Sequence, residues 1–135
     1  MLPRLFFVHF RQTSFIAEEK SQIVGFLIGF FSQTISDEGY IHFVGVHPDH
    51  RRQGVARVLY GRFFETMLEN HRNIVRCVTA PINKNSIAFH SWMGFQIEPQ
   101  ESQVEGIAFH PNYDGVNEDR VLFVKHLSWV SSSPG

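Results

Sequence analysis

The chain has 135 residues and a formal net charge of −1, so it has room for one hydrophobic core, expected over residues 1–130, and no general attraction for nucleic acid. The single cysteine, Cys77, excludes an internal disulfide, and the longest apolar run, residues 23–31, is too short to cross a membrane. These properties predict a cytoplasmic protein with neither a membrane nor a nucleic-acid partner.

The first half of the chain predicts three strands followed by a helix. Residues 15–18 and 23–31 are rich in β-branched and aromatic residues and are joined by a charged segment, which indicates a hairpin. Residues 35–39 predict a turn, and residues 40–46 predict a third strand. From residue 54 to residue 70, apolar residues recur every three or four positions, which is typical of an amphipathic helix.

The second half predicts a strand, a helix and two further strands. The strand at residues 76–80 stops at Pro81, and the helix after it has Asn85 or Ser86 as its cap and ends at Gly94. Residues 95–98 and 120–127 predict the last strands, joined by a long connection at 99–119 that is either mobile or functional. Residues 131–135 predict a disordered tail. This order predicts an α/β (α+β) domain with a mixed, mostly antiparallel sheet flanked by helices.

A basic, glycine-bearing turn joins the third strand to the first long helix. The first N–H groups of a helix have no partner within it and carry partial positive charge, so they can bind a phosphate. Small residues at 54 and 56 let such a ligand approach the main chain, and two arginines add positive charge. The segment predicts an anion-binding loop, although an ordinary turn with solvated arginines is the alternative. The residues are Val44, Gly45, Val46, Arg51, Arg52, Gln53, Gly54, Val55, Ala56 and Arg57.

Two patterns in this order resemble the signatures of the GNAT family of N-acetyltransferases. The pattern Arg51-x-x-Gly54-x-Ala56 resembles the loop that binds the pyrophosphate of acyl-CoA. About thirty residues later, residues 83–95 read NKNSIAFHSWMGF and resemble the second signature, N-x-x-A-I-x-L-Y-x-x-x-G-F, with Ser86 at the small position and His90 in place of tyrosine. The chain is identified as similar to this family, and residues 113–123 resemble a group of its uncharacterised bacterial members.

The resemblance implies the GNAT fold, with acetyl-CoA as acyl donor. It implies that the pantetheine arm enters between the strands at 40–46 and 76–80, where Val44, Gly45 and Val46 offer main-chain groups. The amides from Gln53 to Arg57 would then take the pyrophosphate. Asn83 and Ser86 would contact the donor, although capping of the following helix explains Asn83 equally well.

Transfer of an acetyl group to an amine requires a base and an acid, because an alkylammonium is not a nucleophile and the departing thiolate needs a proton. Where the family has a strand glutamate and a helix tyrosine, this chain has His42 and His90. We therefore expect His42 as base and His90 as acid, with packing as the alternative role of both. His47 and His50 are expected to be turn residues. The histidines lack metal-ligand spacing, so no metal site is expected.

The expected function is N-acetyl transfer from acetyl-CoA to a primary amine by direct attack in a ternary complex. The connection at 99–119 would select the acceptor through His110, Tyr113, Asp114 or Glu118. A catalytically inactive module that binds or senses acyl-CoA is the alternative function.

One departure from the family concerns the N-terminal segment. The resemblance implies that the family's first strand and most of its first two helices are missing. The strand at residues 15–18 would then lie at an exposed sheet edge, which folded proteins tend to cover or pair. We expect either a homodimer, supported by the apolar residues 5–7, or a polypeptide that lacks a natural N-terminal segment.

Overall fold

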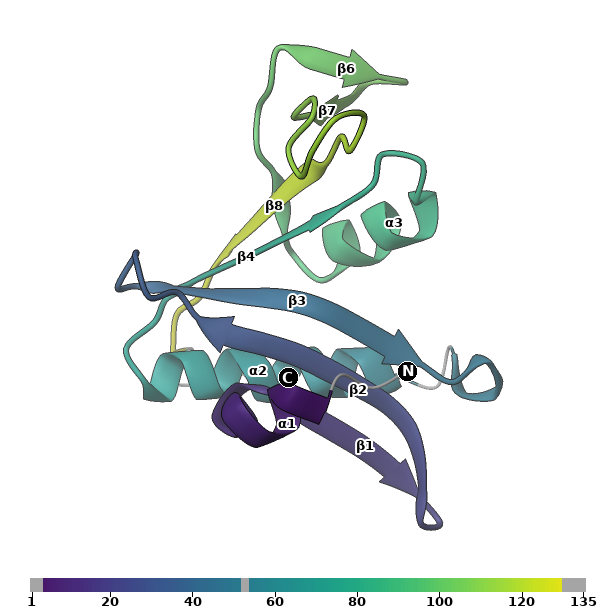
Figure 1. Ribbon diagram of the computed structural model, residues 1–135, viewed down its shortest axis with the longest axis vertical. Helices are drawn as coiled ribbons and strands as arrows, with labels where there is room; N and C mark the ends of the chain where they lie inside the picture. The colour runs from purple at the N-terminus through teal and green to yellow at the C-terminus, as the bar shows by residue number, and fades with distance from the viewer. Residues whose placement is uncertain (1–3, 52–53, 130–135) are drawn as a thin grey trace. The chain divides into compact units, whose positions relative to one another are not determined.

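The computed structural model describes residues 4–51 and 54–129 (Figure 1). The chain divides into two compact units, the first comprising Met1–Val75 with Leu127–Gly135 and the second comprising Arg76–His126. The predicted tail at 131–135 lies outside the described residues, and a single domain over residues 1–130 stays a prediction.

The first unit contains a three-stranded antiparallel sheet in the order β1-β2-β3. The hairpin predicted from residues 15–31 is confirmed. The turn predicted at residues 35–39 is shorter than expected, because Glu38 already begins β3. The elements are α1 (Arg4–His9), the 3₁₀ turn η1 (Arg11–Thr13), β1 (Phe15–Glu19), β2 (Gln22–Phe31), β3 (Glu38–Val46), the 3₁₀ turn η2 (Pro48–His50) and α2 (Val55–Glu69).

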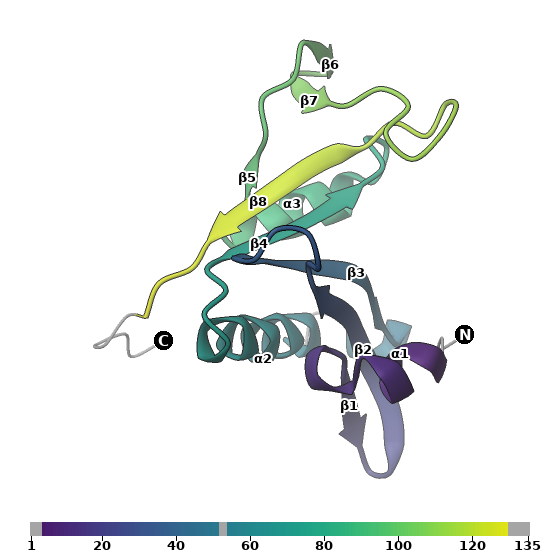
Figure 2. The same ribbon diagram turned by 60° about the vertical axis from the view of Figure 1, so that its left-hand side comes forward.

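Helices cover both faces of this sheet, as Figures 1 and 2 show. Helix α2 packs Phe63 so closely against Gly29 of β2 that a Cβ at residue 29 would overlap the phenyl ring. On the other face, Phe6 of α1 stacks on His42, and Phe10 at the end of that helix approaches Phe30. Leu27 and Ile28 are both fully buried. Because successive side chains of a strand point to opposite faces, Leu27 faces α2, as Gly29 does, and Ile28 faces α1. The core of the unit therefore lies on both sides of β2.

A β-bulge interrupts the pairing of β2 with β3. Ile28 pairs with Phe43 and Gly29 pairs with Ile41, so His42 is the additional residue on β3. As a result, His42 and Phe43 both point to the α1 face, where His42 stacks on Phe6 and Phe43 contacts the ring of Phe26. Bulges of this kind re-aim side chains and are frequent beside functional sites.

The second unit holds the end of β4 (Ile74–Thr79), α3 (Lys84–Trp92), β5 (Gln96–Ile97) and β8 (Val121–His126). Its strands follow the order β4-β8-β5, and β5 is antiparallel to β8. The predicted mixed, mostly antiparallel sheet with helices is confirmed. Of the three residues considered as caps of α3, Asn83 takes the role and Asn85 and Ser86 do not: its side chain accepts a hydrogen bond from Ser86 N at 3.1 Å.

The connection at 99–119 contains structure that the sequence analysis did not predict. It forms a hairpin of β6 (Ser102–Val104) and β7 (Ile107–Phe109). Glu105 and Gly106 both have positive φ, 51° and 81°, as a two-residue type I′ turn requires. The segment that remains irregular is therefore much shorter than expected.

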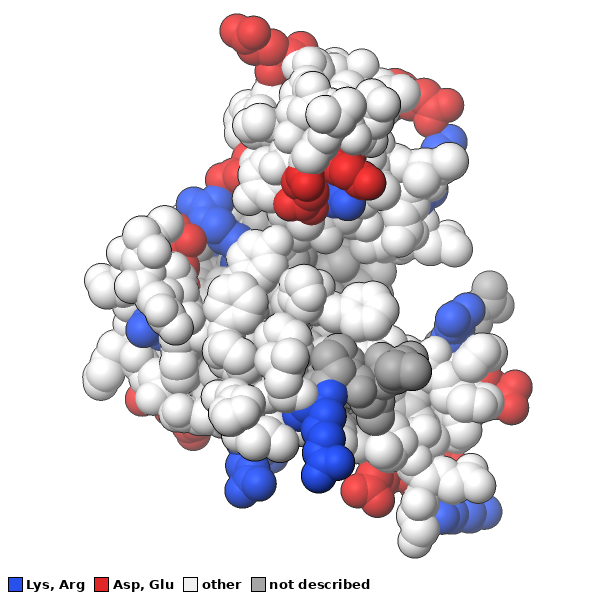
Figure 3. All heavy atoms as spheres, viewed as in Figure 1, with Lys and Arg blue, Asp and Glu red and all other residues white. Residues whose placement is uncertain are grey.

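Basic and acidic side chains are scattered over the surface drawn in Figure 3, most of which is uncharged, and neither sign forms a continuous field there. Within the described ranges, no helix combines the length and apolar character needed to cross a membrane.

Candidate functional site

The anion-binding loop is built around Gly54, which precedes the first turn of α2. Gly54 has φ +80° and ψ 9°, the left-handed conformation that glycine adopts without a Cβ penalty. The first helical hydrogen bond runs from Val58 N to Gly54 O at 3.0 Å. The N–H groups of Val55, Ala56 and Arg57 precede that bond, and among the described residues neither a capping side chain nor an acidic residue in the first turn competes for them. Three amides and the positive end of a fifteen-residue helix are thus available to an anion.

The turn before this helix holds the exposed Arg51 beside the end of β3. Arg51 Nε donates to Val46 O at 3.4 Å. His47 Nδ1 accepts a hydrogen bond from Asp49 N at 3.1 Å, and His50 Nε2 lies 3.6 Å from Glu19 Oε1. Both histidines therefore serve the turn, as expected. Arg52 and Gln53 lie outside the described residues.

The strand residues of the predicted donor site lie next to this loop in the first unit. Val44 pairs with Leu27, Gly45 with Phe26 and Val46 with Gly25. A Cβ at residue 25 would lie 2.8 Å from Val55 Cγ1, so the close approach of β2 to the start of α2 depends on a glycine. The structure thus brings the end of β3, Arg51 and the first turn of α2 together, as the sequence predicted.

Asn83, Ser86 and His90 form a connected row along one side of α3 in the second unit. Asn83 Oδ1 caps the helix through Ser86 N, and His90 Nδ1 lies 2.8 Å from Ser86 O and 3.2 Å from Ser86 Oγ. The capping role of Asn83 is thereby observed. A contact of its amide with the donor stays a prediction.

His90 is a buried residue whose ring packs among phenylalanines. Only 7% of it is exposed. Its ring stacks on Phe123 at 4.7 Å between centroids and meets Phe95 edge-on at 5.2 Å. Burial lowers the pKa of His90 below its usual value, and the hydrogen bond with Ser86 O offsets part of that effect. Because a carbonyl can only accept, Nδ1 carries the hydrogen, and the neutral ring presents Nε2 as an acceptor.

His42 has a different environment from His90. It is exposed at the bulge of β3, and its ring lies 5.5 Å from that of Phe6 with an interplanar angle of 23°. An exposed imidazole can exchange protons with solvent, which a base requires. The two candidate catalytic histidines belong to different units.

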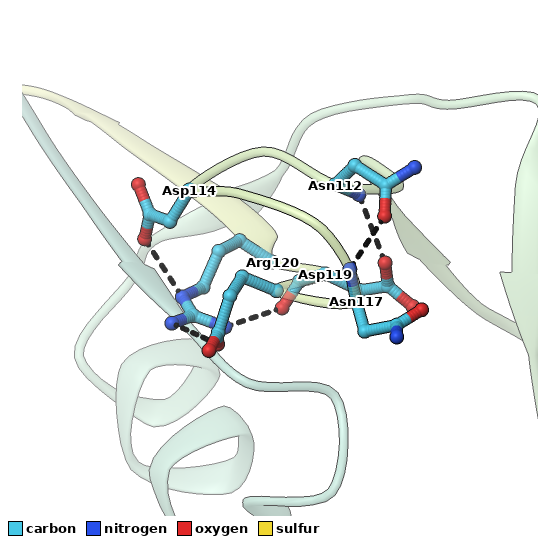
Figure 4. Close-up of polar contacts among 6 residues, drawn as sticks. Asn112, Asp114, Asn117, Asp119 and Arg120 are labelled. Carbon is cyan, nitrogen blue, oxygen red and sulfur yellow. Dashed lines mark hydrogen bonds and ion pairs between the residues drawn. The ribbon is translucent and has the colours of Figure 1, made fainter.

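Arg120 organises the irregular part of the connection before β8 (Figure 4). Its Nε lies 2.9 Å from Asp114 Oδ2, its Nη2 lies 3.1 Å from Glu118 Oε2, and its Nη1 donates to Asp119 O at 2.8 Å. Asp114 and Glu118, two of the predicted acceptor contacts, are therefore partly neutralised. Tyr113 is half exposed and meets His110 edge-on at 5.2 Å.

A hollow of about 890 Å³ lies between α3, the β6–β7 hairpin and this segment. Its floor includes Ile87 and Phe109, and Glu118 lines it. Lys84 and Ala88 also line the hollow, and they lie about 120–160° around α3 from Ser86 and His90, whereas Ile87 lies only about 60° from His90. The hollow therefore lies mostly on a different side of the helix from the His90 row and reaches its flank at Ile87.

The aromatic neighbours of both histidines and the hairpin were not predicted from the sequence. Phe123, the ring that stacks on His90, lies thirty-three residues later in the chain, so no local pattern predicts that contact. The hairpin had a signal in Glu105-Gly106, a turn pair between two short alternating segments. In the part of the chain that the structure describes, no group of three or more His, Cys, Asp or Glu side chains is arranged to hold a metal ion.

Solved structures share this fold. Ard1 from Thermoplasma volcanium has 21% identity and a TM-score of 0.75, over 92% of this chain and 76% of that one. Naa50 from Arabidopsis thaliana, in complex with the bisubstrate analogue CoA-Ac-MVNAL, has 18% identity and a TM-score of 0.70, over 86% and 74%. The protein yncA from Salmonella typhimurium, with its cofactor acetyl-CoA, has 20% identity and a TM-score of 0.71, over 98% and 76%.

Family membership follows from the sequence itself. A comparison with proteins of curated function finds no match. The sequence profile described as "Acetyltransferase (GNAT) family" matches residues 2–95, more than half of the chain. Together with the fold and the loop before α2, this match shows that the chain belongs to the GNAT family of acetyltransferases.

Proposed function

We propose that this protein transfers an acetyl group from acetyl-CoA to a primary amine, by direct attack of the amine in a ternary complex. The observation that carries the proposal is the start of α2, where Gly54 in the left-handed conformation leaves three amide groups for a pyrophosphate. Arg51 adds a positive charge beside them. The single cysteine is a buried thiol whose pKa is strongly raised by burial, which leaves it unsuited to form an acyl-enzyme and agrees with a reducing, cytoplasmic setting.

In this proposal His42 removes the proton from the attacking ammonium. Its exposure at the bulge supports the role, since the amine must reach it from solvent. A main-chain N–H near Val44 stabilises the oxyanion of the tetrahedral intermediate. The remaining requirement is a proton for the departing thiolate.

We assign that proton to His90, on the α3 side that also holds Asn83 and Ser86. Its environment makes this role difficult for His90. To donate a proton from Nε2 the ring must first be protonated there, and burial lowers the pKa of the ring. This observation favours the second candidate function, a module that binds acyl-CoA without turnover. In that case His90 is a packing residue of α3.

The residues around Arg120 are proposed to select the acceptor amine. This segment keeps a net negative charge, because the single positive charge of Arg120 is outnumbered by the three carboxylates of Asp114, Glu118 and Asp119. A net negative charge favours a cationic amine. Glu118 also lines the hollow beside α3, whose apolar floor suits an acceptor with an apolar body.

The experiment offers the protein acetyl-CoA with alkylamines, lysine and short peptides that have free N-termini. Release of the CoA thiol and the mass of the acetylated product are followed together. Transfer to any of these amines supports the enzyme. Binding of acetyl-CoA without transfer to any of them supports the binding module, and failure to bind acetyl-CoA contradicts both candidates.

The variants His90→Phe and His90→Tyr separate the two roles of His90. Both keep an aromatic ring, but only tyrosine restores a proton donor. If His90 is the acid, the phenylalanine variant should lose about a hundredfold in kcat and the tyrosine variant should recover much of it. Equal activities would assign His90 to packing.

A further inference from the structure

Strand β1 forms the outer edge of the sheet in the first unit. In the described part of the chain, β2 is its only strand neighbour. Three of its five residues, Ile16, Glu18 and Glu19, are exposed. The backbone N–H and C=O groups along the outer side of such a strand are available for pairing with another chain. The edge therefore has the chemistry of a strand-pairing surface.

The pairing of β1 with β2 fixes which side chains face α2. Phe15 pairs with Leu27 and lies under α2, where the guanidinium of Arg62 sits 5.6 Å from its ring centroid. The bulge in this hairpin adds its extra residue, Val24, to β2, so β1 itself alternates regularly. Glu19 consequently faces the same side as Phe15, and Ile16 and Glu18 face the α1 side.

Arg62 and Glu19 stand at opposite ends of this edge with opposite charges. Arg62 is exposed and makes no ion pair with any described carboxylate. The side chain of Glu19 is 55% exposed, and its nearest basic partner is His50 Nε2 at 3.6 Å, beyond a normal hydrogen bond. Each of the two can therefore take an additional partner.

We propose that two copies of this chain form a dimer by antiparallel pairing of their β1 strands, centred on Ala17. This register places the partner's Glu19 opposite Phe15, directly below Arg62, and the two-fold axis repeats the contact. Two Arg62–Glu19 ion pairs then form between the copies, on the α2 side of the paired β1 strands. Because two-fold pairing uses the β1 edge of both copies, the assembly closes as a dimer at this edge.

The charges on β1 favour this register over the register that is centred one residue later. Moving the centre to Glu18 would set Glu18 opposite Glu18 of the partner subunit, and like charges directly opposite each other are destabilising. Centring on Ala17 overlaps all five residues and sets Ile16 opposite the partner's Glu18, whose aliphatic stem covers it. Ile16 is 41% exposed in the single chain and becomes covered on pairing.

The test is a charge exchange between the two members of the proposed ion pair. Arg62→Glu and Glu19→Arg are made singly and together, and their masses are measured by analytical ultracentrifugation over a hundredfold range of concentration. Glu69→Arg, an exposed change at the end of α2, is the control for altered charge, and circular dichroism confirms that each variant folds.

We expect a concentration-dependent monomer–dimer equilibrium for the unmodified chain and for Glu69→Arg. Each single exchange should raise the dissociation constant about tenfold or more, and the double exchange should return it to within a few-fold of the original. A monomeric mass at every concentration, an assembly larger than a dimer, or a double variant no better than the single variants would overturn the proposal.

Discussion

The Nδ1 atom of His90 lies 2.8 Å from the carbonyl oxygen of Ser86, one helical turn earlier in α3. This contact holds the imidazole in the tautomer with hydrogen on Nδ1, while Phe123 stacks on the ring at 4.7 Å. The neutral form is the one that this environment accommodates, since burial lowers the pKa of His90. Protonation of His90 at low pH therefore opposes the packing of α3.

We predict that His90 makes the protein less stable as the pH falls. The unfolded chain binds a proton at His90 below about pH 6.5, whereas the folded chain does so only at a lower pH. Stability should therefore decrease from about pH 7 downward until the folded pKa is passed. The free energy of unfolding, measured in urea, should differ less between pH 7.5 and pH 5.5 for His90→Phe than for the unmodified chain.

The control for this comparison is His126→Phe, which removes an exposed histidine of the same unit. If His90→Phe and the unmodified chain lose the same stability between the two pH values, the buried neutral state of His90 is wrong.

Gly29 is predicted to be indispensable for the contact of β2 with α2. A Cβ at this position would lie 2.9 Å from Tyr40 O and overlap the ring of Phe63. Gly29→Ala should lower the free energy of unfolding by about 1–3 kcal/mol. Gly61→Ala is the matched control, because nothing lies within 4 Å of that position in the interior of α2. It should raise stability by up to about 1 kcal/mol. Urea unfolding of both variants measures the contrast, and equal effects would contradict this packing.

Arg120 is predicted to hold the segment from Asn112 to Asp119 in place. Arg120→Met removes the contacts with Asp114, Glu118 and the carbonyl of Asp119. Amide hydrogen exchange in this segment should become about tenfold faster. Lys84→Met, which removes the exposed pair with Glu105, should leave that exchange unchanged. Unaltered exchange in Arg120→Met would show that the turn's own hydrogen bonds suffice.

Local patterns predicted most elements of the fold. Strands β1 and β2 follow from their richness in β-branched and aromatic residues, β3 follows the turn before it, and helix α2 follows from apolar residues every three or four positions. The β6–β7 hairpin was missed because its strands have only three residues each, too few for alternation to stand out. The cap of α3 could not be fixed from the sequence, since Asn83, Asn85 and Ser86 are all good capping residues.

Part of the candidate site could also be predicted from the sequence, and part could not. The loop at Gly54 could be predicted because its glycine, its arginines and the start of α2 are adjacent in sequence. The bulge at His42 could not, because it depends on the register between β2 and β3. Nor could the burial of His90, whose ring contacts Phe123, thirty-three residues later in the chain.

Binding of acetyl-CoA to the loop at Gly54 is the central claim, and calorimetric titration of two glycine variants tests it most directly. Gly54→Glu places a negative side chain where the pyrophosphate is proposed to lie. Gly106→Glu introduces the same side chain at nearly the same backbone conformation, φ +81° against +80°, in the turn between β6 and β7. We expect the unmodified chain and Gly106→Glu to bind acetyl-CoA with affinities within a few-fold of each other, and folded Gly54→Glu to bind at least about a hundredfold more weakly, a loss of about 2.7 kcal/mol. Unchanged affinity in folded Gly54→Glu would contradict the account.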